Sequence, residues 1–306
     1  EMILGTVEIT IKCGIHQVFH RFDSIELPPC DEWEDNDAGR RFLPSFIFPR
    51  DPAVRDILSA SQAFLRALTD DVIAGFDGYQ QSFAGSSSEA VRSQLRAIWV
   101  TLQTTHRLDY VNPPPTYTRG KQRLRTPEEV LRGRRGPCIE LALLLSACWE
   151  HIGINPVIFL TPGHAFTGYW TSSDAWTRFF TDIVERATAG ASSTEGIKDD
   201  DAITDKRQFD ATTMVGGGTL TKDEAWVLKG PHHLAMIHRE VLAGNLVAVE
   251  ATAVSLQKPF GLAEQEGRDL LLSIRHIDDF DGMIDCQKAR ERNVTPLAIL
   301  TQGVLA

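Results

Sequence analysis

The chain is 306 residues long, with a hydrophobic fraction of 42%, a charged fraction of 24% and a formal net charge of −10. This length can build one large or two modest domains with a substantial core. The acidic balance argues against a general nucleic-acid binder, which needs a basic face. No window reaches the about 18 consecutive apolar residues of a membrane span, so we expect no membrane partner.

Five widely spread cysteines, without a CxxC pair, favour a reducing compartment. The first residues lack the basic and apolar regions of a signal peptide. We therefore expect a cytoplasmic protein with free thiols. The chain starts without a methionine, which is compatible with a piece of a longer protein that has other domains.

Residues 1–45 predict a small N-terminal element. Two β-like runs, 3–11 and 16–27, are broken at Cys13–Gly14, which is typical of a hairpin. The acidic stretch that follows, 28–41, is interpreted as a solvated linker. The main domain is then expected to cover residues 46–306.

Two helical patterns precede the centre of this domain, at residues 52–68 and 89–105, with apolar residues at i, i+3 and i+4 spacing. The proline-rich run 110–117 indicates a rigid extended connection, or a polyproline ligand for another domain. Thr126, Pro127 and Glu129 then form the pattern of a capping box that starts a short helix.

The segment 119–135 is the one concentrated basic feature. It can serve an acidic substrate or partner, or aid a nearby thiolate, and it can equally be ordinary surface charge. Its seven basic residues are Arg119, Lys121, Arg123, Arg125, Arg132, Arg134 and Arg135.

Residues 133–170 predict a loop, a buried helix and two strands. Cys138 falls at the start of an almost wholly apolar helix, where the helix dipole favours a thiolate. His164 opens the second strand, after the turn at Pro162–Gly163. A thiol and an imidazole at the ends of one compact unit are what cysteine nucleophile chemistry needs. The alternative is a buried structural cysteine and a capping histidine.

The stretch 245–254 predicts a buried strand that carries one carboxylate, Glu250, followed by Thr252. A charged group in such a strand is costly unless it is paired, and an imidazole would remove that cost. His232, His233 and His238 lack metal-ligand spacing with a second cluster. No metal or cofactor is therefore expected.

Four pieces together resemble the transglutaminase-like superfamily, which shares the papain-type arrangement of cysteine, histidine and acid. The similarity is densest to bacterial transglutaminase-like domains. The matching pieces are QRLRTP at 122–127, Gly136 with Cys138, GHAF at 163–166, and Glu250 with Thr252.

The resemblance implies an α+β, papain/transglutaminase-like fold, in which a buried nucleophile helix packs on an antiparallel sheet. It implies Cys138 as nucleophile, His164 as base and acid, and Glu250 as the orienting acid. Gln122 is a candidate oxyanion donor by analogy with a glutamine upstream of the nucleophile in papain-like enzymes. A loop-packing role for Gln122 is the alternative.

Two departures from the family pattern concern the acid. The family usually has Asp where this chain has Glu250, and Glu250 follows His164 by 86 residues. Residues 171–244 would then be an insertion between adjacent strands, with its polar part, 187–219, as a lid. Asp182 is the competing acid.

The sequence thus predicts a cysteine peptidase or amidase that cleaves a protein or peptide through a Cys138 thioester. Two alternatives remain, a transglutaminase-type acyl transferase and a non-catalytic peptide-binding module. The only partners expected are a protein or peptide substrate and other domains of a longer chain.

Overall fold

The computed structural model describes residues 3–27, 29–80, 87–112, 120–192 and 226–298. Within these ranges the chain is an α+β protein, as the sequence predicts. The described residues form nine α-helices, one five-stranded antiparallel sheet and three two-stranded sheets. No helix in the described part of the chain is long and apolar enough to cross a membrane.

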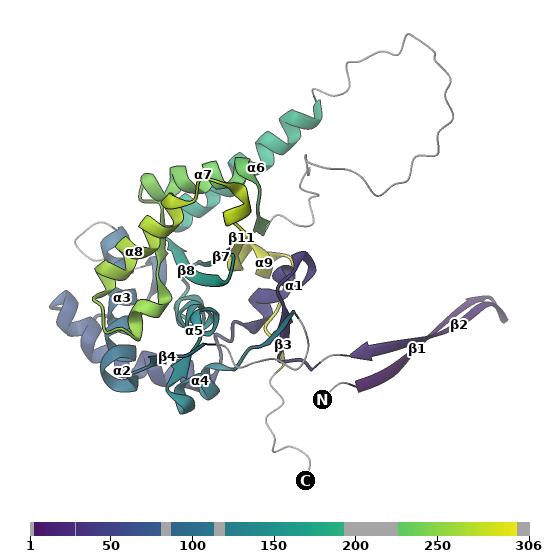
Figure 1. Cartoon of the computed structure of the whole chain (residues 1–306), viewed down its shortest axis with the longest axis horizontal. Helices are drawn as coiled ribbons and strands as arrows, with labels where there is room; N and C mark the ends of the chain where they lie inside the picture. Colours follow the sequence, from purple (N-terminus) through teal and green to yellow (C-terminus); the bar gives the residue numbers. More distant parts are fainter. Residues whose placement is uncertain (1–2, 28, 81–86, 113–119, 193–225, 299–306) are drawn as a thin grey trace.

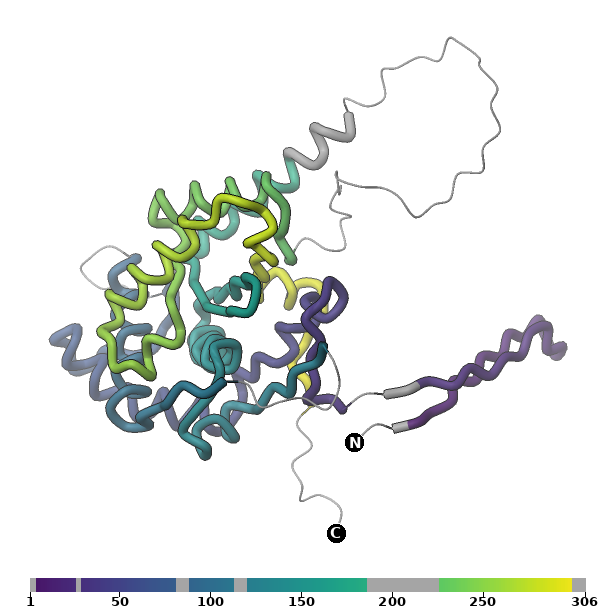
Figure 2. Tube along the Cα trace, in the orientation of Figure 1, coloured from purple at the N-terminus to yellow at the C-terminus, as the bar shows by residue number. Residues whose placement is uncertain are grey.

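The first two strands form a long hairpin that projects away from the rest of the chain (Figures 1 and 2). Strand β1 (Ile3–Cys13) pairs antiparallel with β2 (His16–Leu27), and the register shifts once, between Ile11 and Lys12. The turn between them contains Gly14 at a φ of 61°, a left-handed conformation that glycine adopts without strain. The alternating pattern of these strands therefore gives the expected hairpin.

The acidic stretch after the hairpin differs from the expected linker. It forms the short strand β3 (Glu32–Glu34) and the helix α1 (Asp37–Phe42). Trp33 is buried, and its indole nitrogen donates to the carbonyl of Gly39 at 2.9 Å. This buried tryptophan anchors the stretch, whereas the surrounding charges remain at the surface.

Two helices precede the central sheet, as the apolar spacing predicts. Helix α2 (Pro52–Thr69) starts with Pro52 after an Asp51 cap, and it ends before Asp70 in a left-handed conformation. Helix α3 (Ser87–Thr101) packs against α2 and runs into one π-helical turn at Leu102–His106.

The five-stranded sheet has the order β10–β8–β7–β11–β9, and every neighbouring pair is antiparallel. The strands are β7 (Pro156–Thr161), β8 (His164–Trp170), β9 (Val227–Leu228), β10 (Leu246–Val249) and β11 (Gly282–Asp285). The central strands are nearly continuous apolar runs, because both faces of the sheet are covered.

Helix α5 (Cys138–His151) covers one face of the sheet. Every residue from Cys138 to Trp149 is buried. Ile158 of β7 and Tyr169 of β8 belong to the core around α5, whereas the next residues along, Phe159 and Trp170, face the opposite core. The period of two in a strand thus divides its side chains between two layers.

The segment 171–244 supplies much of the second layer. Its helices α6 (Ser173–Ser192) and α7 (Pro231–Leu242) join α8 (Phe260–Ser273) over the other face (Figure 1). The chain leaves the sheet at β8 and returns beside it in β10, with Val249 opposite Thr167. Most of the polar part that was interpreted as a lid lies outside the described residues.

A close approach in this layer requires glycine. A Cβ atom on Gly267 of α8 would lie 2.7 Å from the backbone of Ala248 and Val249. Because α8 sits directly on β10, it supports the strand end from which Glu250 extends. The last helix, α9 (Cys286–Glu291), follows β11 and is capped by Asp285.

Candidate active site

Cys138 occupies the first position of α5. The residue before it, Pro137, is the N-cap and offers no side-chain hydrogen bond to the first turn. The backbone amides of the first turn, at the cysteine end of the helix, therefore have no capping side chain as a hydrogen-bond acceptor. Cys138 is buried but retains 8% of its surface.

An internal ion pair holds the segments around this cysteine. Glu140, in the first turn of α5, accepts from the Arg125 guanidinium at 2.6 and 3.0 Å and from its backbone amide at 3.1 Å. Arg125 also donates to the carbonyl of Arg135 at 2.7 Å. The Arg125 guanidinium thus connects its own segment with the first turn of α5 and with Arg135. These charged hydrogen bonds restrict the backbone that leads into Cys138.

The capping box between Thr126 and Glu129 is present, as the sequence predicts. It starts α4 (Pro127–Gly133), the helix before the cysteine loop. Strand β6 (Arg135–Gly136) then pairs in parallel with β4 (Asp109–Tyr110). These short elements deliver the chain to Pro137 in a defined direction.

His164 and Glu250 contact each other directly. The Nε2 atom of His164 lies 2.8 Å from Oε2 of Glu250, and the His164 ring also hydrogen-bonds the thiol of Cys138. His164 side-chain exposure is 29% and that of Glu250 is 13%. Cys138, His164 and Glu250 therefore form one connected set.

Glu250 does not lie within a strand, in contrast to the strand predicted over residues 245–254. Strand β10 ends at Val249, and Glu250 caps a 3-10 helix over Ala251–Val254. Its other oxygen accepts from the backbone amide of Thr252 at 3.0 Å and from the Thr252 hydroxyl at 2.7 Å. Thr252 thereby satisfies one carboxylate oxygen and leaves the other for His164.

The protonation of the histidine–glutamate pair follows from these contacts. The hydrogen bond with Cys138, and then that with Glu250, raise the pKa of His164 to about 10. Burial raises the pKa of Glu250, but hydrogen bonds from His164 and Thr252 outweigh this, so its pKa lies below the ordinary value. At neutral pH the pair is therefore a protonated imidazole and a carboxylate.

The competing acid has another partner. Asp182 lies on α6 and forms an ion pair with Arg239 of α7 at 3.1 Å. The structure therefore places Glu250, and not Asp182, against His164.

Gln122 lies in β5 (Lys121–Arg123), opposite Trp33 of β3. Its side-chain nitrogen is buried and has no hydrogen-bond partner among the described residues. A buried amide donor without a partner is unusual in a folded protein. The assignment of Gln122 as an oxyanion donor stays a hypothesis.

Tyr110 is a neighbour of the site that motif reasoning did not assign to it. It stands opposite Gly136 in the β4–β6 pair and is 44% exposed. Burial, followed by the charges of Cys138 and Glu250, raises its pKa. The sequence signal that could have found it is an aromatic residue just before a rigid proline run; residues 113–119 of that run lie outside the described ranges.

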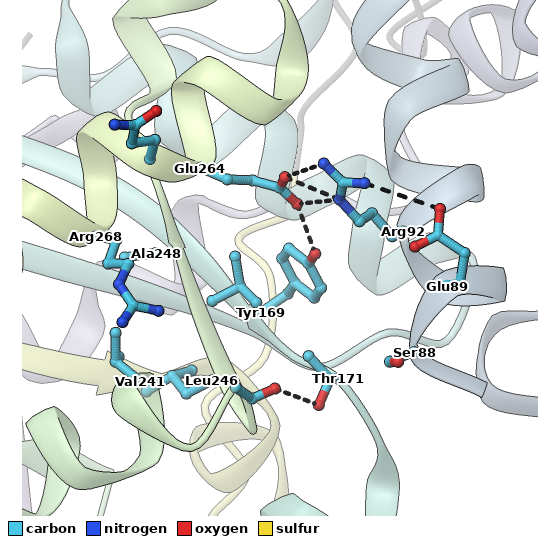
Figure 3. Close-up of a pocket in the computed structure, with 13 residues that line it drawn as sticks. Ser88, Glu89, Arg92, Tyr169, Thr171, Val241, Leu246, Ala248, Glu264 and Arg268 are labelled. Carbon is cyan, nitrogen blue, oxygen red and sulfur yellow. Dashed lines mark hydrogen bonds and ion pairs between the residues drawn. The ribbon is translucent and has the colours of Figure 1, made fainter. Parts of the chain in front are cut away.

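A separate cavity of about 420 Å³ lies toward the other end of β8 (Figure 3). On its wall Glu264 accepts from the Tyr169 hydroxyl at 3.0 Å and pairs with Arg92 at 2.7 Å. These contacts connect α8, β8 and α3. Its two acids, Glu89 and Glu264, are paired with Arg92, and no thiol or histidine among the described residues lines it. This cavity is therefore a less suitable reaction centre than the set formed by Cys138, His164 and Glu250.

No cluster of three or more histidine, cysteine or acidic residues suited to a metal ion occurs within the described ranges. The five cysteines are all free thiols, and Cys148 and Cys286 are buried. Burial raises the pKa of both of these thiols, so neither is a competing nucleophile at neutral pH.

No protein-family model, curated protein or solved structure matches this chain.

Proposed function

We propose that this chain is a cysteine hydrolase of the transglutaminase-like, papain-related class, which cleaves an amide bond in a protein or peptide. The observation that carries the proposal is the bridging position of His164, between the Cys138 thiol and the Glu250 carboxylate. A nucleophile, a base and a group that orients the base are the parts that this chemistry requires.

In the proposed first step, the Cys138 thiolate, whose proton is held by His164, attacks the carbonyl carbon of the amide, and a tetrahedral oxyanion forms. Collapse breaks the carbon–nitrogen bond, and His164 gives its proton to the leaving amine. The product on the enzyme is a thioester. Glu250 holds the imidazole in the required orientation and stabilises its charged form.

In the second step, His164 takes a proton from water, and the hydroxide attacks the thioester. The carboxylic acid leaves, and the thiolate of Cys138 and the protonated imidazole of His164 are restored. An amine in place of water would give a new amide, which is the acyl-transfer alternative. The acyl-enzyme is the same in both reactions, so the acceptor that reaches it determines the outcome.

Stabilisation of the oxyanion needs donors about 3 Å from the developing charge. We assign one donor to the backbone amide of Cys138, at the uncapped start of α5. The buried side-chain nitrogen of Gln122, which has no partner within the described part of the chain, is the second candidate. The free thiols support a cytosolic site of action.

A direct test uses peptides derived from a whole-cell lysate as substrates, with mass spectrometry to detect new termini. Cys138→Ala and His164→Ala are each expected to abolish the new termini. The exposed thiol Cys30 provides the matched control, because Cys30→Ala also removes one cysteine but should retain activity. Adding a primary amine distinguishes hydrolysis from acyl transfer, since only transfer yields modified peptides.

The reactivity of the thiol provides a second measurement. Iodoacetamide at neutral pH should label Cys138 faster than the exposed Cys13 and Cys30 of the same chain. Equal labelling rates, together with unchanged hydrolysis in Cys138→Ala, would exclude the proposal and favour a peptide-binding module.

A further inference from the structure

The basic segment before Cys138 divides into two groups of side chains. Three of its described members have carboxylate partners, since Arg123 pairs with Asp31, Arg125 with Glu140 and Arg132 with Glu128. Arg134 and Arg135 differ, because both are exposed and no carboxylate in the described ranges lies within 4 Å of either guanidinium. Neither charge is paired with a described carboxylate, and the charge of Arg134 lies close enough to His106 to add to the effect of burial in lowering the pKa of that imidazole.

The backbone of this pair is held in place. Arg134 caps α4 in a left-handed conformation, with a φ of 50°, and its carbonyl accepts from the amide of Asp109 at 2.8 Å. The carbonyl of Arg135 accepts from the Arg125 guanidinium at 2.7 Å. With both carbonyls occupied, the two side chains extend from a rigid base into solvent.

The pair also lies close to the nucleophile. Arg135 precedes Cys138 by three residues, and an extended backbone rises about 3.3 Å per residue, so their Cα atoms are separated by at most about 10 Å. Tyr110, whose pKa is raised by burial and then by Cys138, stands opposite Gly136 in the β4–β6 pair. The side chain of Arg135 is therefore within reach of a substrate bound at Cys138.

Few negative charges oppose them. Asp109 stands opposite Arg135 in the strand register but forms no ion pair with it within the described chain. Glu140 is satisfied by Arg125, and Glu250 by His164 and Thr252. Guanidinium groups bind carboxylates through parallel hydrogen bonds, which makes an acidic side chain the matching ligand.

We propose that Arg134 and Arg135 form a subsite that selects protein or peptide substrates with an acidic side chain next to the amide attacked by Cys138. This inference rests on the proposed hydrolase function and adds a substrate class to it. The chain carries a net charge of −10 and as a whole repels acidic partners. A preference for acidic substrates would therefore have to come from local groups such as these two arginines.

The test compares two alkylating reagents of nearly equal size, anionic iodoacetate and neutral iodoacetamide, on the full chain. Mass spectrometry of the Cys138 peptide gives the rate for each reagent. Replacing both residues, Arg134→Glu and Arg135→Glu, should slow iodoacetate about five- to tenfold at low salt. The iodoacetamide rate should change less than twofold. High salt should reduce the difference in iodoacetate rate between wild type and the variant.

A matched control changes two other exposed arginines, with Arg268→Glu and Arg275→Glu in one variant. This control alters the net charge equally but should leave the ratio of the two rates unchanged. A ratio that is the same in wild type and in the Arg134/Arg135 variant, or that falls equally in the control, overturns the inference.

Peptide cleavage separates this inference from the function on which it rests. The expected result is enrichment of Asp and Glu near the cleaved bonds of wild type, with loss of that enrichment in the Arg134/Arg135 variant. Cleavage without acidic enrichment refutes the subsite alone. If no peptide is cleaved and Cys138 reacts no faster than Cys13, both the hydrolase and the subsite are refuted.

Discussion

Each end of strand β8 has a carboxylate that contacts a ring of the strand, but the two carboxylates have different surroundings. At the first end, Glu250 caps a 3-10 helix and accepts from His164; near the last, Asp285 caps α9 and accepts from the Trp170 indole at 2.9 Å. Each carboxylate thus caps a helical turn and contacts a ring on β8. The difference lies in the donors and in access to solvent.

Asp285 is fully buried, and its donors do not titrate near neutral pH. The indoles of Trp170 and Trp176 and the amide of Lys288 surround it. Burial raises its pKa to about 6 despite these hydrogen bonds. Glu250 keeps some exposure and has a partner that can carry a proton, so its pKa falls instead. A capping carboxylate supports structure in the first setting and is suited to proton chemistry in the second.

The largest expected difference between the two ends is in rate. Glu250→Gln retains a similar shape but cannot stabilise a charged imidazole, so kcat/KM for peptide cleavage should fall about 10²- to 10⁴-fold. The unfolding free energy should fall by only about 1 kcal/mol, because the site is partly exposed. Denaturant titration and kinetics on the same variant measure both quantities. A large loss of stability with unchanged kcat would show that Glu250, like Asp285, only supports the structure.

Asp285→Asn should show the reverse pattern. An amide presents two hydrogens toward the indole and backbone donors, so buried donors lose their acceptor, and the variant should lose about 2–4 kcal/mol of stability. Activity per folded molecule should remain near wild type when measured well below the unfolding midpoint. A variant that unfolds like wild type would show that the capping contacts of Asp285 contribute little.

The pH dependence of stability offers a smaller but more specific distinction. His164 has a raised pKa, so its contribution is full below its unfolded value of about 6.5 and is lost as pH rises through about 10. The lowered pKa of Glu250 gives a contribution that is present above about 4.5 and lost at lower pH. The stability difference between wild type and Glu250→Gln should therefore be greatest between about pH 4.5 and 6.5.

Denaturant titrations from acidic to alkaline pH would measure this difference in stability. A difference that increases steadily toward pH 10 would contradict the assigned protonation of the pair.

Local patterns predicted the elements that place Cys138 and His164. The apolar run after Cys138 is long enough for a buried helix, and the Pro162–Gly163 turn before His164 has a clear signal. The helix predicted over residues 52–68 also forms, as α2. In these segments local propensity and tertiary packing favour the same structure.

Long-range pairing was harder to predict. Strand β7 pairs with β11, more than 100 residues later, and no local pattern specifies that register. Asp285 consequently had no visible partner in the sequence, since its two indole donors belong to distant segments. The strand predicted through Glu250 stopped one residue earlier, because the Glu250 side chain bonds the Thr252 amide and turns the backbone.

The position of α6 and α7 between β8 and β10 has a consequence for synthesis. A nascent chain that has emerged only as far as β8 contains Cys138 and His164 but no Glu250, which follows 86 residues later. The third member of the set joins only after α6, α7 and β10 have been translated and β10 has paired with β8. The contact between His164 and Glu250 is therefore completed late, when the chain returns to the sheet.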